Sequence, residues 1–158
     1  MFNFVKNLTI ILIMEIKYHN LYIHFVLTTL NRMPVIPEKN RQRIEKYITG
    51  IVKNNKCRLY AIYANPEHVH LLISKVQNID EEELITIIAG SSERFINENK
   101  LCVGLFQWQD SCSAFSVSKR DIPKICDYIQ NQSEHHKKQC YEEENAAFIK
   151  FYQQTIKK

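Results

Sequence analysis

Apolar residues recur at helical spacing in three stretches of the chain. The first is Glu38–Asn54, where they lie three, four or seven residues apart and share one helix face. The second begins after Asp80, a residue type that caps helices, and extends to about Asn97. The third follows Ser118 or Asp121. The three apolar stripes consist of Ile44, Tyr47, Ile48, Ile51 and Val52; Leu84, Ile87, Ile88 and Phe95; and Ile122, Ile125, Cys126 and Ile129.

Runs rich in aromatic and β-branched residues predict strands between these helices. The predicted strands are Tyr18–Leu30, Cys57–Tyr63, Glu67–Lys75, Leu105–Gln109 and Cys112–Val117, the last two around a tight turn at Gln109-Asp110. The short gap between the second and third strands predicts a hairpin. The order is β-α-β-β-α-β with one further strand and one further helix. It is typical of an α+β fold, a ferredoxin-like or RNA-recognition-like antiparallel sheet with helices on one face plus an added C-terminal helix.

The length of 158 residues suits one domain with short extensions. We expect an N-terminal extension at 1–14, one domain at 15–152 and a C-terminal tail at 153–158. The apolar run Leu8–Met14 is too short to span a bilayer, and no small-residue cleavage site follows it. No membrane partner is therefore expected, and Met14 could equally be the true start.

Composition excludes several classes of protein. Five cysteines, an odd number without a Cys-x-x-Cys pair, argue against a disulfide framework or a zinc knuckle and favour the reducing cytoplasm. Only three glycines occur, so the chain has no glycine-rich phosphate loop, and ATP is not expected as an energy source. A net charge of +4 is compatible with nucleic acid without requiring it.

The most informative chemistry lies in the third predicted strand. Residues i and i+2 of a strand face the same side, so His68 and His70 project together, roughly 7 Å apart along the strand. Val69 points the other way, towards a core. Two converging imidazoles can hold one divalent metal ion, although two unrelated histidines on a wet strand face would give the same pattern.

Tyr128 and Gln132 lie four residues apart on the third predicted helix and so share a face. Tyr128 stands at the edge of the apolar stripe, from where it could reach a site on the sheet. Spacing alone favours the simpler interpretation, a half-buried tyrosine and a solvated glutamine.

Three segments stand in an informative order and spacing: Pro66–Leu72 with its two histidines, Ser113–Ser118 ahead of the third helix, and Tyr128–His136 within it. Together they resemble the HUH single-tyrosine transposases of small bacterial insertion sequences, including the REP-associated tyrosine transposases. The resemblance covers roughly residues 15–152. Relatives often carry Gly-Tyr-Gly where this chain has Asp110–Ser113, and an apolar residue where it has Asn65.

The resemblance implies a metal-dependent single-stranded DNA transposase. Tyr128 would attack a DNA backbone phosphate at hairpin-marked element ends and form a 5′-phosphotyrosine, which strand transfer reseals without ATP. His68, His70 and Gln132 would bind Mg²⁺ or Mn²⁺, and His136 is a possible alternative ligand. The resemblance also implies a homodimer, in which the tyrosine helix of one chain docks on the histidine pair of the other.

Other residues have simpler interpretations. His24 and Trp108 are expected in the core, although Trp108 could stack on a base. Candidate contacts to DNA phosphates are Lys39, Arg41, Arg43, Lys119, Arg120, Lys137 and Lys138.

Two other functions remain open from the residues. One is a non-catalytic nucleic-acid-binding module of RNA-recognition type, with Tyr22 and Tyr60 stacking on bases. The other is a regulatory metal-binding protein of ferredoxin-like fold. Only a transposase would form a covalent adduct with single-stranded DNA.

Overall fold

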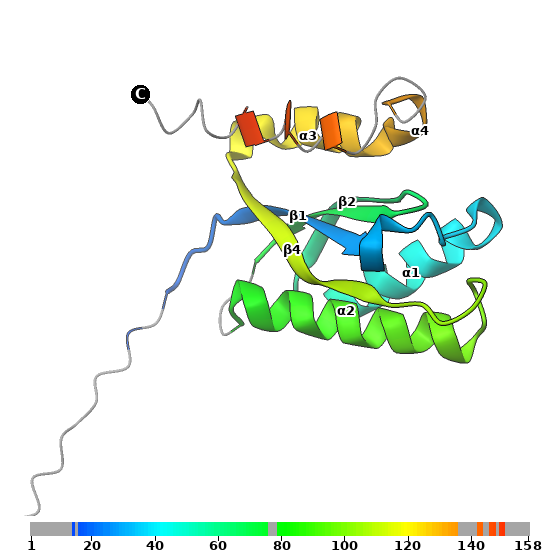
Figure 1. Cartoon of the computed structure of the whole chain (residues 1–158). Helices are drawn as coiled ribbons and strands as arrows, with labels where there is room; N and C mark the ends of the chain where they lie inside the picture. The colour runs from blue at the N-terminus through cyan, green and yellow to red at the C-terminus, as the bar shows by residue number, and fades with distance from the viewer. Residues whose placement is uncertain are drawn as a thin grey trace, which may run out of the picture.

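The computed structural model describes residues 14, 16–75, 79–135, 142–143, 146–147 and 149–150. Its elements, apart from two short 3₁₀ turns, are β1 (Tyr22–Thr29), α1 (Glu38–Asn54), β2 (Arg58–Ala64), β3 (His68–Ser74), α2 (Glu81–Glu98), β4 (Trp108–Val117), α3 (Ile122–Gln130) and α4 (Gln132–His135). The four strands form one antiparallel sheet in the order β2-β3-β1-β4 (Figure 1). The predicted α+β fold class is confirmed.

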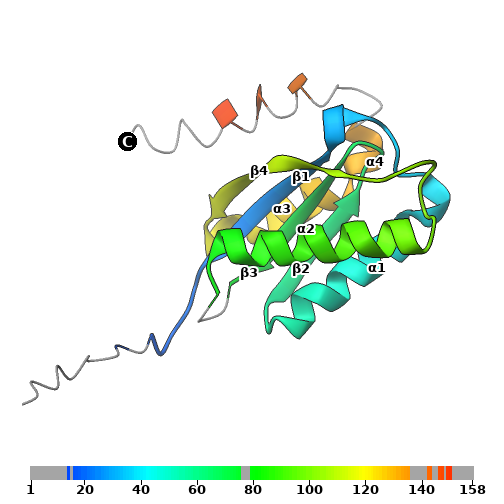
Figure 2. The same ribbon diagram turned by 60° about the horizontal axis from the view of Figure 1, so that its bottom comes forward.

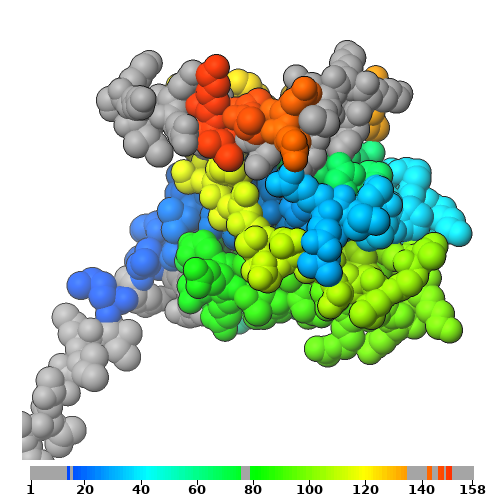
Figure 3. Space-filling view, viewed as in Figure 1, coloured from blue at the N-terminus to red at the C-terminus, as the bar shows by residue number. Residues whose placement is uncertain are grey.

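Helices cover both faces of this sheet. α1 and α2 lie together on one face, as predicted, and enclose the main core (Figure 2). α3 lies on the opposite face over a smaller core that includes Leu72, Ile125 and Ile129. Figure 3 shows the same layers in space-filling form, with α2 in green on one side and described C-terminal segments in orange and red on the other.

Strand alternation decides which side chains of β3 reach each layer. Val69, Leu71 and Ile73 are buried in the main core with α1 and α2. Leu72 belongs to the smaller core, and His68 and His70 lie on the same sheet face as Leu72. The histidines are therefore beneath the α3 layer.

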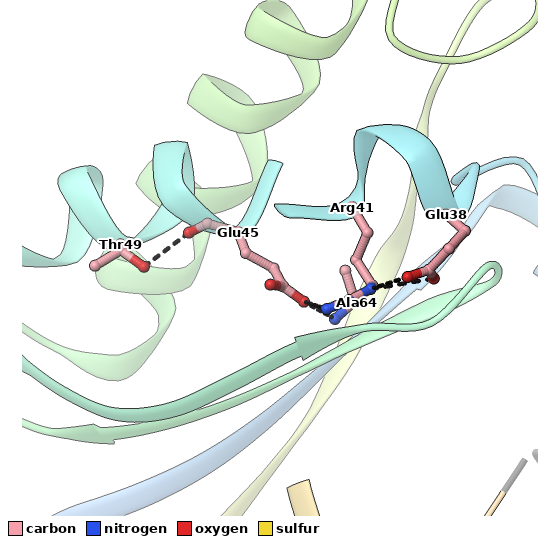
Figure 4. Close-up of polar contacts among 5 residues, drawn as sticks. All are labelled: Glu38, Arg41, Glu45, Thr49 and Ala64. Atoms are coloured by element: carbon pink, nitrogen blue, oxygen red, sulfur yellow. Dashed lines mark hydrogen bonds and ion pairs between the residues drawn. The ribbon is translucent and has the colours of Figure 1, made fainter. Parts of the chain in front are cut away.

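The end of β2 is held by α1 through a network of polar contacts (Figure 4). Glu45 Oε1 accepts hydrogen bonds from the backbone N–H of Ala64 at 2.9 Å and from Arg41 at 3.0 Å. Arg41 also donates to Glu38 at 2.9 Å, and its guanidinium stacks 4.7 Å from the centre of the Tyr63 ring. These contacts fix the point at which the chain enters the β2–β3 hairpin.

Two strand predictions were wrong in their limits. β1 begins at Tyr22 rather than Tyr18, since the strand starts where its pairing with β3 and β4 starts. The two predicted strands around Gln109-Asp110 are one continuous strand, β4. β4 is an outer strand whose pairing with β1 is irregular at this same point. Leu27 pairs with Cys112 and Thr29 with Trp108, so β4 holds the extra residues of a bulge where the turn was predicted.

Helix ends follow the capping residues. The Asp80 side chain accepts a hydrogen bond from the Glu83 N–H and starts α2, as predicted. Ser118 caps a 3₁₀ turn (Lys119–Asp121) that leads into α3. Among the described helices, none is long and apolar enough to cross a membrane.

Candidate functional site

The two histidines of β3 converge at one point. Their Nε2 atoms lie 3.0 Å apart, with ring centroids 4.7 Å apart and ring planes nearly perpendicular. His68 is fully buried and His70 is 2% exposed. The two side chains therefore point the same way, as predicted, but they lie in a buried layer and not on a solvent-exposed strand face.

The other ring nitrogens of the pair have partners too. His70 Nδ1 lies 3.0 Å from Nε2 of His24, and His68 Nδ1 lies 3.3 Å from a carboxylate oxygen of Glu67. Histidines that bind metal usually form a hydrogen bond through the second nitrogen, which fixes the ring and its tautomer. His70 has such a contact with His24, and His68 lies within ion-pair distance of Glu67. Burial, followed by the nearby His68, lowers the pKa of His24 to about 4, so His24 is neutral at pH 7.

Tyr128 reaches the histidines from α3 of the same chain. The centroid of its ring lies 5.8 Å from that of His70, edge to face. The side chain is half-buried. The apolar residues Ile125 and Ile129 pack α3 onto the sheet. This packing fixes the distance between Tyr128 and β3.

Gln132 completes the cluster from a different element than predicted. α3 ends at Gln130, and Gln132 is the first residue of the short helix α4, so the two side chains do not share one continuous helix. The buried Gln132 side chain nevertheless faces the site, where its Oε1 accepts a hydrogen bond from Asn65 Nδ2 at 3.1 Å. The same Asn65 nitrogen lies 3.0 Å from His68 Nε2.

These donors fit a hard divalent cation. Two ligands at right angles around an ion with bonds of about 2.1 Å lie about 3.0 Å apart, which matches the spacing of the histidine Nε2 atoms. Two neutral imidazoles and one amide oxygen suit Mg²⁺ or Mn²⁺. The described residues contain no group of three or more His, Cys, Asp or Glu placed to hold a metal, and here the third donor is an amide.

The predicted DNA contacts fall on both faces of the sheet. Lys119 and Arg120 are exposed in the turn that leads into α3, on the face that carries Tyr128. Lys39, Arg41 and Arg43 belong to α1 on the opposite face. Of these, Arg41 is held by Glu38 and Glu45. His136, Lys137 and Lys138 lie outside the described residues.

Arg43 is also engaged within the fold, since it donates to Asn99 at 2.6 Å. Its guanidinium lies over the Phe95 ring of α2. This pairing joins α1 to α2.

A hollow of about 440 Å³ opens near the histidines on the β1–β4 side. Thr28, which pairs with His68 in the sheet register, forms part of its wall. Its lining is mostly polar: Thr28, Asn31, Arg32, Gln109, Ser111, Cys112 and Ser113.

Sequence reasoning missed three residues of this site. His24 was expected only in the core; it is buried as expected, but it also contacts His70. Asn65 and Glu67 come shortly before the histidine motif in the sequence, and this proximity was the one signal that could have identified them.

Trp108 is a core residue, as expected, and its indole N–H donates to Ser92 at 3.0 Å.

Comparison with known proteins agrees with this geometry. The family described as IS200-like transposases matches residues 17–132. A crystal structure of a candidate transposase from Deinococcus radiodurans R1 is 22% identical, with a TM-score of 0.58 over 77% of this chain and 98% of that one.

A second solved structure, a REP-associated tyrosine transposase bound to a REP hairpin, is 16% identical, with a TM-score of 0.58 over 79% of this chain and 74% of that one. At these sequence identities the two structures support a shared fold and nothing more. No curated protein matches the chain. The family match spans most of the chain and includes both histidines, Tyr128 and Gln132, so the protein belongs to the IS200-like transposases, a family of DNA-processing enzymes.

Proposed function

We propose that this transposase cleaves and rejoins single-stranded DNA at hairpin-marked ends, with Tyr128 as the nucleophile. The observation that carries the proposal is the placement of the Tyr128 ring against His70, beside His68 and Gln132. A tyrosine at this place can meet a phosphate that is held by the histidine cluster.

The reaction exchanges one phosphate ester for another. Tyr128 Oη bonds to phosphorus, the bond to the 3′ oxygen breaks, and the released 3′ hydroxyl takes a proton. A free tyrosine has a pKa near 10, so Tyr128 must lose its proton as it attacks. A second 3′ hydroxyl then attacks the 5′-phosphotyrosine and frees the tyrosine. The number of ester bonds is conserved, so no ATP is required.

His68, His70 and Gln132 would hold the divalent ion, Mg²⁺ or Mn²⁺, and His136 remains the alternative ligand. The ion would neutralise charge on a non-bridging phosphate oxygen as the transition state forms. The chain's own contribution is orientation. Glu67 lies close to Nδ1 of His68, and His24 contacts Nδ1 of His70. These contacts keep both Nε2 atoms directed at the same point.

DNA would approach along the face that carries α3. Lys119 and Arg120 are exposed in the turn that leads into α3 and are the described candidates for phosphate contacts on this face, with Lys137 and Lys138 as further candidates. The polar hollow at Thr28 lies close enough to the histidines to take nucleotides that flank the reacting phosphate. Recognition of a DNA hairpin is proposed from the relative whose structure contains a REP hairpin.

The non-catalytic RNA-recognition alternative receives less support. It requires aromatic side chains on an open sheet surface. Tyr22 and Tyr60 instead pack edge to face, with centroids 5.6 Å apart, against the small core under α3. Both rings are partly buried by this packing, which reduces the surface that could stack on bases.

The decisive test is covalent trapping on single-stranded DNA that carries a hairpin, with Mn²⁺ present. The wild-type protein should form an adduct that survives denaturing electrophoresis. Tyr128→Phe should form none, while its hairpin binding stays within about twofold. Tyr47→Phe, a matched change on the opposite face, should react like the wild type. An adduct with the Tyr128→Phe protein would rule out this nucleophile.

A further inference from the structure

The Asn65 side chain lies inside the histidine cluster. It is only 2% exposed, and its Nδ2 is 3.0 Å from His68 Nε2 and 3.1 Å from Gln132 Oε1. Both of those atoms are proposed metal ligands. The amide of Asn65 therefore touches two ligand atoms that come from different elements, β3 and α4.

Asn65 is held there by its backbone. Its N–H donates to the carbonyl oxygen of His68 at 2.8 Å, which closes the turn between β2 and β3. The preceding residue, Ala64, is tied to Glu45 of α1. The short side chain thus starts from a fixed point and needs no large motion to stay in the cluster.

The amide now donates hydrogen to the lone pairs that a cation would use. When an ion takes those lone pairs, the N–H groups lose their acceptors and face a positive charge. A half-turn of the amide exchanges Nδ2 with Oδ1, two groups of nearly equal size. The oxygen would then stand about 3 Å from the two other ligand atoms, the distance expected between neighbouring ligands of one octahedral ion.

We propose that Asn65 is a fourth protein ligand of the metal ion, through Oδ1. The inference rests on the proposed metal site of His68, His70 and Gln132. An asparagine carbonyl oxygen is a suitable ligand for Mg²⁺ and Mn²⁺, whereas an apolar side chain at this position supplies none.

The opposite result is expected if Asn65 only occupies the ligand atoms in the absence of metal. If the amide only occupies the ligand atoms until the ion arrives, it competes with the ion, and its removal strengthens metal binding. If Asn65 is a ligand, its removal weakens metal binding. The direction of the change in affinity therefore separates the two roles.

The experiment is calorimetric titration of the full chain with MnCl₂ at pH 7.5, without DNA. Asn65→Ala should raise the Kd for Mn²⁺ about tenfold or more. Asn65→Asp, which offers a carboxylate oxygen at the same place, should bind Mn²⁺ at least as tightly as the wild type. Asn97→Ala is the matched control, since Asn97 also uses its side chain twice, to the backbone of Phe106, but on α2 across the sheet. Its Kd should not change.

Unchanged or tighter Mn²⁺ binding by Asn65→Ala would overturn the inference and leave the other three ligands in place. If Asn65→Ala does not fold, weaker binding by Asn65→Asp than by the wild type would overturn it equally. A wild-type protein that binds no Mn²⁺ would remove the proposed metal site as well. The adduct experiment on Tyr128 tests the nucleophile separately, so the two failures can be told apart.

Discussion

His68 and His70 are buried polar residues with polar groups close to both ring nitrogens. The two rings contact different residues: His68 lies close to the preceding Glu67, and His70 contacts His24 of β1. Removal of one ring would leave buried polar atoms without a partner, which typically costs about 1–3 kcal/mol. These residues therefore contribute to stability as well as to the proposed chemistry.

We predict that His68→Ala loses measurable Mn²⁺ binding and adduct formation, and lowers the free energy of unfolding by about 1–3 kcal/mol. Calorimetry measures the first effect and urea denaturation measures the last. Ser92→Ala is the control, because it removes a buried hydrogen bond under Trp108 on the opposite face. It should lose stability and keep Mn²⁺ affinity. Undiminished Mn²⁺ binding by His68→Ala would show that His68 is no ligand.

The sequence was sufficient to pair His68 with His70, because strand alternation depends only on the positions i and i+2. It could not identify His24 as the neighbour of His70. That contact depends on which residues of β1 and β3 lie opposite one another, and the register is decided by the whole sheet. The contact of Asn65 with Gln132 joins residues 67 positions apart and depends on where α3 docks.

At the scale of elements, α3 differs from the other two long helices in what holds it. α1 and α2 each bury four residues against the main core, whereas α3 buries Ile125 and Ile129 over the smaller one. α3 also ends at Gln130 before the site is complete, and α4 begins at Gln132. The helix with the proposed nucleophile is thus the least anchored of the three.

We predict that backbone amides of α3 exchange with deuterium faster than those of α1 and α2. Local opening of a helix with few buried apolar contacts costs less than global unfolding. Mass spectrometry of peptides after timed exchange measures this. Ile129→Ala should speed exchange in α3 and leave α2 unchanged, whereas equal protection of all three helices in the wild type would contradict the prediction.

The elements were predictable to very different degrees. The limits of α1 agree with the prediction at both ends, since its apolar period is regular and Asn54 and Asn55 stand at its end. β4 was wrongly divided, since a run of small polar residues on an outer strand has the composition of a turn. The break after α3 was missed, since helical spacing continues across it in the sequence.

The whole molecule carries a modest positive charge, and the described basic residues lie on both of its faces. We predict steeply salt-dependent binding to hairpin DNA, with weaker binding to plain duplex. Removing a side chain that binds one phosphate should reduce the slope of log K against log salt by about 0.7–0.9. Fluorescence anisotropy should show this for Lys119→Ala and Arg120→Ala. Lys53→Ala, an exposed residue of α1 outside the candidate contacts, is the control and should leave the slope unchanged. Equal affinity for duplex and hairpin would contradict hairpin recognition.

Assembly is a separate question at this scale. Within one chain, Tyr128 already lies against its own His70. The resemblance to dimeric transposases instead predicts that α3 is exchanged between two subunits. On this prediction, Tyr128→Phe and His68→Ala proteins, each inactive alone, regain cleavage when mixed, since one site of the mixed dimer has both residues intact. Mixed dimers that stay inactive would show that the arrangement within one chain is the catalytic one.

The cover that α3 and α4 form over the histidines also has a consequence for equilibrium. His68 and His70 are almost completely shielded from solvent. We predict that a phosphate reaches them only in molecules where this cover has opened, and that Tyr128 meets the phosphate when the cover closes again. The affinity measured for a reacting strand is then the intrinsic affinity multiplied by the fraction of open molecules. If opening costs about 2.7 kcal/mol, about one molecule in a hundred is competent, and measured binding is about a hundredfold weaker than the open form allows. A hairpin that binds the open form more tightly would raise that fraction, so recognition of the DNA would itself switch on the cleavage site.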